Sequence, residues 1–170
     1  MEIRHHKTGN TTSEAHFSPC GRYRYLLSRH WQTTGHSVNF IMLNPSVADE
    51  FANDPTVERC ERRARAMGFA GFSVTNIFAW RDTDPKAMRR AKKPIGPLNE
   101  LTVLQTAQNA GQAIAAWGVH GAHTNQGPHI ARILDEAGVK LFHLGLTKDG
   151  HPRHPLYVPY SIKPKIWHVS

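Results

Sequence analysis

The chain has 170 residues, of which 39% are hydrophobic and 20% are charged. This length fits one domain that can bury about two-thirds of its unfolded surface, and the composition excludes a disordered or low-complexity chain. Lysine and arginine number 21 against 13 aspartate and glutamate, so the formal net charge is +8 with the 12 histidines neutral. This excess indicates an acidic partner, although it is also compatible with an ordinary solvated surface.

Membrane and secretion signals are missing from the sequence. No apolar run reaches the roughly 20 residues that a membrane-spanning helix needs, and residues 1–7 carry charges without an apolar signal core behind them. Only two cysteines occur, Cys20 and Cys60, without a Cys-x-x-Cys spacing. This usage is typical of a reducing compartment and predicts packing roles for both thiols. We therefore expect a cytoplasmic protein that contacts no membrane.

The first predicted elements form an antiparallel hairpin. Residues 22–29 alternate in part between apolar and polar side chains, and residues 33–36 have turn chemistry. Residues 38–43 form an almost continuous apolar run that ends at Asn44 and Pro45. Such a run predicts a central strand covered on both faces.

Helices and short buried strands alternate in the rest of the chain. Two helices begin at an Asp-Pro pair, which places aspartate at the N-cap and proline in the first turn. The predicted helices cover residues 55–67, a short segment from 85, 97–108 and 128–137, and the predicted strands cover residues 71–78, 113–117 and 139–144. This alternation favours a parallel sheet with right-handed crossovers in a single domain spanning residues 1–170.

Polar side chains follow each predicted parallel strand, and ligands bind beyond these strand ends in such sheets. The segments that carry them are Asn44, Pro45, Ser46, Asp49 and Asp54 after the first strand, Asn76 after the second, Trp117, Gly118, Val119 and His120 after the third, and residues 151–157 after the fourth. The glycine motifs of dinucleotide and ATP sites and the Gly-x-Ser-x-Gly elbow are absent from the sequence. We therefore expect no cofactor.

Each of these residues also has a structural interpretation. Asn44 can belong to a turn that ends a strand, Asp54 can be a helix cap, and Trp117 can be a core residue. His151 and His154 have the spacing of a metal half-site, but they lie among prolines and lack partner ligands, so no metal site is predicted. The prediction of a functional site therefore depends on the order of the whole set of residues along the chain, and not on any one of them.

The ordered motifs resemble those of a small bacterial and phage domain family and, through it, the uracil-DNA glycosylase superfamily. They are Met42-Leu43-Asn44-Pro45-Ser46, Asp54-Pro55-Thr56, Thr75-Asn76-Ile77-Phe78, Ala116-Trp117-Gly118, Leu144-Gly145-Leu146-Thr147 and Pro152-Arg153-His154-Pro155-Leu156-Tyr157. The resemblance runs from about Tyr23 to Tyr157. It implies a three-layer αβα fold with a central, mostly parallel four-stranded sheet, to which the N-terminal antiparallel hairpin is added.

The resemblance also implies roles for two asparagines. In the superfamily an Asn or Asp of the first motif orients the attacking water, and Asn44 occupies that position here. The glycines that flank this residue in the superfamily are replaced by Met42 and Ser46. An Asn at the end of the next strand reads the edge of the extruded base in the superfamily, and Asn76 matches it.

A histidine loop completes the resemblance. In the superfamily a His-Pro-Ser-Pro-Leu loop supplies a histidine that stabilises the departing base and a leucine that wedges into the duplex. The loop aligns here at His154, our preferred choice, or at His151 with one insertion. The corresponding wedge is Leu156 or Tyr157.

The chemistry of N-glycoside hydrolysis suits these residue types. The reaction develops positive charge on the sugar and negative charge on the leaving base. Asn44 can orient water toward the sugar, with Asp49 and Asp54 as candidate bases, and a histidine can donate a hydrogen bond to the departing base. Further candidate contacts to the base are Pro45, Ser46, Phe51, Phe78 and Trp80.

The sequence therefore predicts a monofunctional DNA glycosylase that acts as a monomer on an extruded, modified or mispaired base, in repair or in defence against phage DNA. Lys148, Arg153 and Arg81 are the candidate contacts to the DNA backbone. Two alternatives stay open. One is a nucleic-acid-binding module that has the same fold without the reaction, and the other is a hydrolase of nucleosides or other small N-glycosides.

Overall fold

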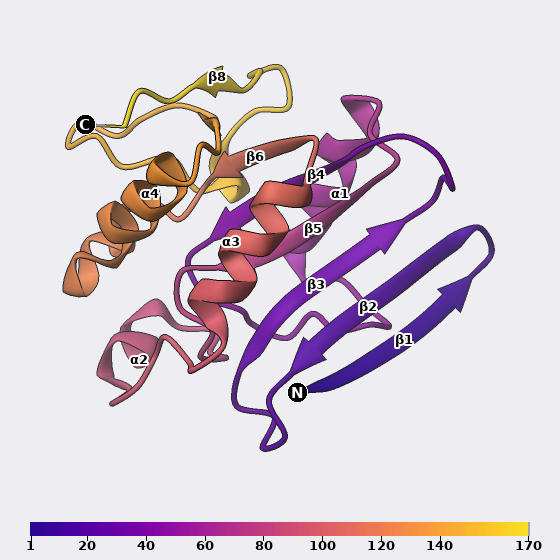
Figure 1. Cartoon of the computed structure of the whole chain (residues 1–170), viewed down its shortest axis with the longest axis horizontal. Coiled ribbons are helices and arrows are strands. Elements are labelled where there is room, and N and C mark those ends of the chain that lie inside the picture. Colours follow the sequence, from indigo (N-terminus) through magenta and orange to yellow (C-terminus); the bar gives the residue numbers. More distant parts are fainter. Residues whose placement is uncertain (170) are drawn as a thin grey trace.

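The computed structural model describes residues 1–169 and contains one eight-stranded sheet with helices on both faces (Figure 1). The strands are β1 (Glu2–Thr8), β2 (Thr11–Phe17), β3 (Arg24–His30), β4 (Ser37–Met42), β5 (Gly71–Asn76), β6 (Gln112–Ala115), β7 (Leu141–His143) and β8 (Lys165–Ile166). The helices are α1 (Pro55–Ala66), α2 (Pro85–Arg90), α3 (Asn99–Asn109) and α4 (Gln126–Glu136), with short 3-10 turns at Val119–Asn125 and Pro155–Tyr157. The sheet order is β1-β2-β3-β5-β4-β6-β7-β8.

The predicted four-stranded, mostly parallel sheet with a separate hairpin is wrong. β5, β4, β6 and β7 are parallel neighbours, but β1, β2 and β3 extend the same sheet in antiparallel order, and β8 pairs antiparallel with β7. The chain is thus α/β with a mixed sheet. β1 was missed because it is mostly exposed, so its sequence lacks the apolar periodicity that signals a half-buried strand.

The predicted pairing of residues 22–29 with 38–43 is also wrong. β3 pairs antiparallel with β5, where Leu27 lies opposite Val74, and β4 lies on the other side of β5. The turn between β3 and β4 therefore joins two strands that a third strand separates. β4 is buried along nearly its whole length, and a central position between two parallel strands covers both of its faces.

The two predicted Asp-Pro helix starts are confirmed. Asp54 Oδ1 accepts from the backbone N–H of Val57 at 2.8 Å at the start of α1. Asp84 Oδ1 accepts from the N–H of Lys86 at 2.9 Å at the start of α2. Both bonds satisfy N–H groups that have no partner within the helix.

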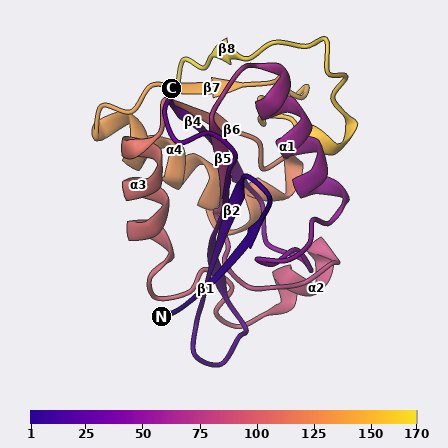
Figure 2. The same cartoon turned by 90° about the vertical axis from the view of Figure 1, so that its right-hand side faces the viewer.

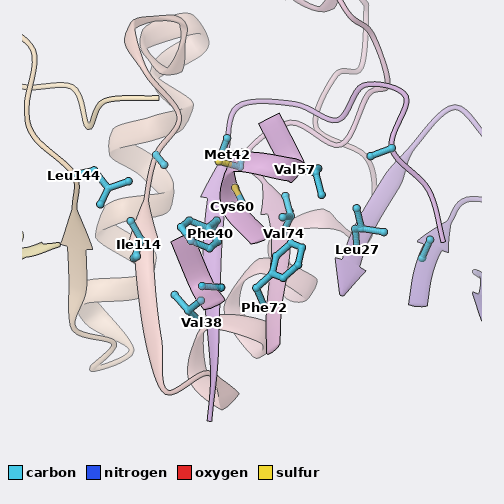
Figure 3. Close-up of a cluster of buried hydrophobic side chains, with 14 of the residues drawn as sticks. Leu27, Val38, Phe40, Met42, Val57, Cys60, Phe72, Val74, Ile114 and Leu144 are labelled. Atoms are coloured by element: carbon cyan, nitrogen blue, oxygen red, sulfur yellow. The ribbon is translucent and has the colours of Figure 1, made fainter. Parts of the chain in front are cut away.

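The sheet divides the core into two parts, since helices cover both of its faces, as the edge-on view in Figure 2 shows. On the face that packs on α1, here called the α1 face, alternate strand residues join side chains of α1 (Figure 3). They include Val38, Phe40, Met42, Phe72, Val74 and Ile114. The opposite face, here called the α3 face, packs on α3 and α4 through Ile41, Val103 and Ile130. Because side chains alternate along a strand, Asn44 and Asn76 continue the rows of the α1 face.

Every helix in residues 1–169 is too short or too polar to cross a lipid bilayer. Both cysteines are free thiols. The predicted packing role is confirmed for Cys60, which is buried in the core of the α1 face, and is wrong for Cys20, which is exposed.

Candidate functional site

The carboxyl ends of the parallel strands meet at one edge of the sheet, which we call the rim and define by Asn44, Asn76, Gly118 and His154. Met42 lies opposite Asn76 in the register of β4 and β5. The N–H of Ala116 donates to Ile41 O at 2.8 Å. The N–H of Gly118 donates to the carbonyl of Pro152, also at 2.8 Å, close to His154 in the chain. The structure thus gathers at one edge the segments that the sequence pattern singled out.

The side chain of Asn44 is held by one end of its amide. Its Nδ2 donates to Asp82 O at 2.8 Å and to Pro45 O at 3.3 Å. Pro45 is buried and Ser46 is half-buried, so both contribute more to the shape of the loop than to the polar surface of the rim. With Nδ2 fixed by two carbonyls, Oδ1 is oriented as an acceptor for a water or a hydroxyl group.

Asn76 is only 1% exposed. Its Nδ2 is buried and has no hydrogen-bond partner within residues 1–169. The backbone around it is clamped from the other face, because Asn99 Nδ2 donates to Asn76 O at 2.7 Å and Gln126 Nε2 donates to Ile77 O at 3.2 Å. Sequence reasoning missed Asn99 and Gln126, although polar residues in the first turn of a buried helix are a signal for such contacts.

His154 is partly buried and neutral. Its Nδ1 accepts from the N–H of Leu156 at 3.3 Å, so the proton of the neutral ring is on Nε2. Burial lowers the pKa of His154 to about 4, and the nearby Asp54 carboxylate opposes this shift. A Cβ on Gly118, whose φ is +73°, would lie 3.4 Å from His154 Cβ, so glycine suits this close approach.

His151 lies in a different setting. Its backbone N–H donates to Thr147 Oγ1 at 3.1 Å, and its carbonyl accepts from the N–H of Thr147 at 2.8 Å. These bonds close a turn at residues 147–151, which follows β7 and precedes His154 in the chain. Of the two candidate histidines, His154 is therefore the one beside Gly118 and Asp54.

Both candidate carboxylate bases shape the loop after β4. Asp49 Oδ1 accepts from the N–H groups of Phe51 at 2.9 Å and Ala52 at 3.0 Å. Asp54 caps α1, and its Oδ2 accepts from the N–H of Ala48 at 3.4 Å. The structural interpretation of Asp54 as a cap is confirmed, and its charge also acts on His154.

The aromatic candidates do not gather under Asn76. Phe51 is 67% exposed, and its ring centroid lies 4.9 Å from that of His6 on β1. Phe78 is fully buried in the core of the α3 face. Trp80 is half-buried and lies edge-on to Tyr23 at 5.7 Å.

The two wedge candidates differ in exposure. Leu156 is half-buried, whereas Tyr157 is 83% exposed. Tyr157 is therefore the side chain of this pair that projects into solvent.

Buried arginines hold the loop of residues 45–54, a role that sequence reasoning missed. Arg24 Nη1 donates to Ala48 O at 2.8 Å, and burial lowers the pKa of Arg24 to about 10. Arg29 Nη2 donates to Asp49 O at 2.7 Å, and its Nε donates to Asn53 Oδ1 at 2.8 Å. These arginines belong to β3, where the sequence showed only a partial alternation.

Arginines of α1 hold the histidine loop in a similar way. Arg59 Nε donates to Pro155 O at 3.0 Å, and Arg63 Nη1 donates to Ile162 O at 2.7 Å. Arg81, a candidate DNA contact, donates from Nη1 to Gly21 O at 3.0 Å and lies over the Phe17 ring at 4.8 Å. Much of the positive charge thus binds the protein's own carbonyls.

Exposed positive charge remains near the rim. Lys148 and Arg153 are exposed on the segment that leads to His154. α2 begins shortly after Asp82, whose carbonyl accepts from Asn44. On and just after α2 the exposed basic residues are Lys86, Arg89, Arg90, Lys92 and Lys93. Among residues 1–169, no group of three or more His, Cys, Asp or Glu side chains is arranged to hold a metal ion.

Comparisons with curated proteins and with solved structures found no match. A family model described as "Protein of unknown function (DUF1643)" matches residues 24–156, which span β3 to the histidine loop and include every rim residue. The chain therefore belongs to the DUF1643 family.

Proposed function

We propose that this protein is a DNA glycosylase, which acts as a monomer in the cytoplasm and hydrolyses the N-glycosidic bond of an extruded, modified or mispaired base. The observation that carries the proposal is the rim itself. It combines an oriented amide oxygen on Asn44, a neutral imidazole on His154 and a buried, unpartnered amide on Asn76. These three groups match the needs of the sugar, the leaving base and base recognition.

Asn44 and His154 serve the two ends of the breaking bond. Asn44 Oδ1 accepts a hydrogen bond from the attacking water and orients its lone pair toward the sugar carbon, where positive charge develops. His154 donates from Nε2 to the departing base, on which negative charge develops. One well-placed donor of this kind typically contributes about 10²–10³ in rate.

Asn76 supplies recognition of the base. A buried donor without a partner costs about 1–3 kcal/mol, and a carbonyl on the edge of an extruded base would give Asn76 Nδ2 its acceptor. Because Asn76 is closed from solvent, the loops at residues 45–54 and 145–157 must part as the base enters. Lys148, Arg153 and the basic residues of α2 would hold the flanking phosphates.

Two observations favour a nucleic-acid-binding module without the reaction as the second candidate. Asp49 and Asp54 both accept hydrogen bonds from their own loop, so neither is poised as a general base. Met42 and Ser46 also replace the glycines that let the superfamily backbone approach a sugar. A binding module would use the same exposed charge without cleaving a bond.

The test is an abasic-site assay. The protein is incubated with duplexes that contain uracil, mismatched, oxidised, alkylated or phage-type modified bases, and hot alkali then cuts each abasic site. We expect cleavage of at least one substrate and its loss in Asn44→Ala and in His154→Asn, with DNA binding retained. Asn109→Ala, at the exposed end of α3, is the matched control and keeps full activity. Tight binding with no cut in any duplex would establish the binding module instead, and release of free base from nucleosides would indicate a small-molecule hydrolase.

A further inference from the structure

The end of β5 is held from the α3 face by side-chain amides that belong to two helices. Asn99 Nδ2 donates to Asn76 O at 2.7 Å and to Ile77 O at 3.2 Å. Gln126 Nε2 donates to the same Ile77 carbonyl at 3.2 Å. We call Asn99 and Gln126 the amide pair. The pair binds two consecutive carbonyls at the position where Asn76 enters the rim.

The amide pair acts where the ladder between β3 and β5 ends. The last pair of this ladder is Leu27 with Val74. The two segments meet again where the N–H of Arg24 donates to Ala79 O, three residues past Asn76. Buried carbonyls need donors, and the amide pair supplies them to the stretch of backbone between these two contacts.

Both members of the amide pair stand at the start of a helix. Asn99 is the first residue of α3, and Gln126 is the first residue of α4. Neither helix has a side-chain bond at its N-cap, whereas α1 and α2 each have an aspartate cap. His129 Nε2 lies 2.9 Å from Glu100 Oε1, so the first turns of α3 and α4 also contact each other. The two amides therefore reach β5 from a pair of helices that are joined at the same end.

Burial of these amides has a cost that apolar side chains would avoid. Asn99 is completely buried, and Gln126 is 3% exposed. Asn99 Oδ1 is buried and has no hydrogen-bond partner within residues 1–169. A buried polar atom without a partner destabilises a fold, and nearby positions of the same helices carry apolar side chains such as Val103 and Ile130. What the amides contribute is therefore the hydrogen bonds that their nitrogens donate.

We propose that Asn99 and Gln126 are positioning residues that fix the side-chain donor of Asn76 for recognition of the extruded base. The amide pair binds the backbone from the α3 face, whereas the side chain of Asn76 lies on the α1 face, because side chains alternate along a strand. Asn76 Nδ2 is buried without a partner. A donor that is held in place before its ligand arrives needs no reorganisation when the ligand binds, and a supporting set of residues must hold it within about 0.5 Å. Only the identity of the ligand, an extruded base, rests on the proposed function.

The first experiment follows the side-chain amide of Asn76 by NMR in the protein without ligand. The resonances of this amide are assigned by their loss in Asn76→Ser. Asn99→Leu removes the bonds to both carbonyls with little change in volume, and Gln126→Leu removes the remaining bond to Ile77 O. We expect both variants to shift or broaden the Asn76 resonances and to speed the exchange of the amide protons with solvent. The effect should be larger in Asn99→Leu, which loses more bonds.

Val103→Ala and Ile130→Ala are the matched controls, because they remove packing from α3 and α4 in the same core without removing a bond to either carbonyl. They should lower the free energy of unfolding and leave the Asn76 resonances close to their wild-type positions. Unchanged Asn76 resonances in both amide variants, or equal changes in the controls, would overturn the proposal. If Asn99→Leu does not fold, Gln126→Leu decides alone, since it keeps both bonds of Asn99.

The second experiment measures kcat/KM with the duplex that wild type cleaves fastest in the abasic-site assay. A misplacement of about 1 Å can cost about 10²-fold in rate, so Asn99→Leu should lower kcat/KM by about tenfold or more. Val103→Ala should stay close to wild type under conditions in which both variants are folded. Equal losses in these two variants would count against a positioning role. If wild type cleaves no duplex, the glycosylase proposal fails, and the NMR result still decides whether the amide pair positions Asn76.

Discussion

Asp54 links the start of α1, the loop after β4 and the candidate histidine, which makes it the most informative single position. Its Oδ1 accepts from Val57 N–H at 2.8 Å and its Oδ2 accepts from Ala48 N–H at 3.4 Å. Burial lowers the pKa of Arg24, and the negative charge of Asp54 opposes this shift. We compare Asp54→Ala, which removes all of these interactions, with Asp54→Asn, which keeps the cap.

The expected magnitudes follow from these contacts. Loss of an N-cap costs about 1 kcal/mol, and leaving the buried N–H of Ala48 without an acceptor costs about 1–2 kcal/mol. Asp54→Ala should therefore lower the free energy of unfolding by about 2–3 kcal/mol. Asp54→Asn retains an oxygen for Val57 and should lower it by about 1–2 kcal/mol.

Urea denaturation checks both values. With a slope of about 2 kcal/mol per molar for a protein of this size, Asp54→Ala should shift the midpoint down by about 1–1.5 M. Asp54→Asn should shift it by about half of that amount. Equal urea midpoints for the two variants would show that the cap bond contributes nothing. If Asp54→Ala shifted the midpoint by less than about 0.2 M, neither hydrogen bond of Asp54 would stabilise the fold.

Three further predictions concern the histidine loop and the thiols. Burial lowers the pKa of His154 in the folded protein to about 4, below the ordinary value of about 6.5. The unfolded chain therefore binds the extra proton, and the free energy of unfolding falls as the pH drops from 6.5 toward 4. Between pH 7 and pH 5, urea denaturation should show that wild type loses about 2 kcal/mol more than His154→Asn. An equal pH dependence of the two proteins would contradict this. Arg59→Ala should lower the free energy of unfolding by about 2 kcal/mol and speed amide exchange in the histidine loop. The control Arg62→Ala loses only an exposed ion pair with Glu58 and should lower the free energy of unfolding by less than about 0.5 kcal/mol. Equal exchange rates in the two variants would exclude a role of Arg59 in holding the loop. A thiol reagent at pH 7 should modify exposed Cys20 in the folded protein, because a hydrogen bond with the Ser18 hydroxyl lowers the pKa of Cys20. Cys60 should react only on unfolding, because it is buried and burial raises its pKa. Fast reaction of both thiols in the folded protein would disprove the burial of Cys60.

The local signals in the sequence were sufficient where one physical effect dominates. Asp54 and Asp84 begin helices because a side-chain carboxylate followed by proline satisfies local N–H groups whatever the rest of the chain does. The apolar runs at residues 38–43 and 113–117 became buried strands because their side chains have no alternative to the core. Both the helix starts and the apolar strand segments depend on residues within a few positions of one another in the chain.

The charges show where local reasoning fails. Arg24, Arg29, Arg59 and Arg63 resemble surface residues in the sequence, yet their guanidinium groups bind carbonyls that lie about 20 to 100 positions away in the chain. A donor with five N–H groups can satisfy such carbonyls only after the strands and loops are in place. Sequence spacing therefore overestimated the charge that is available for a partner.

The sequence by itself determined the order of helices and strands from α1 to β7, the two Asp-Pro caps and the set of residues that follows the parallel strands. Tertiary structure decided the position of β5 between β3 and β4, the addition of β1 and β2 to the sheet and the burial of Asn76. Pairing of strands depends on which faces a sheet can cover, and that is a property of the assembled layers and not of any one segment. The same assembly divides the positive charge between internal contacts to backbone carbonyls and the exposed surroundings of the rim.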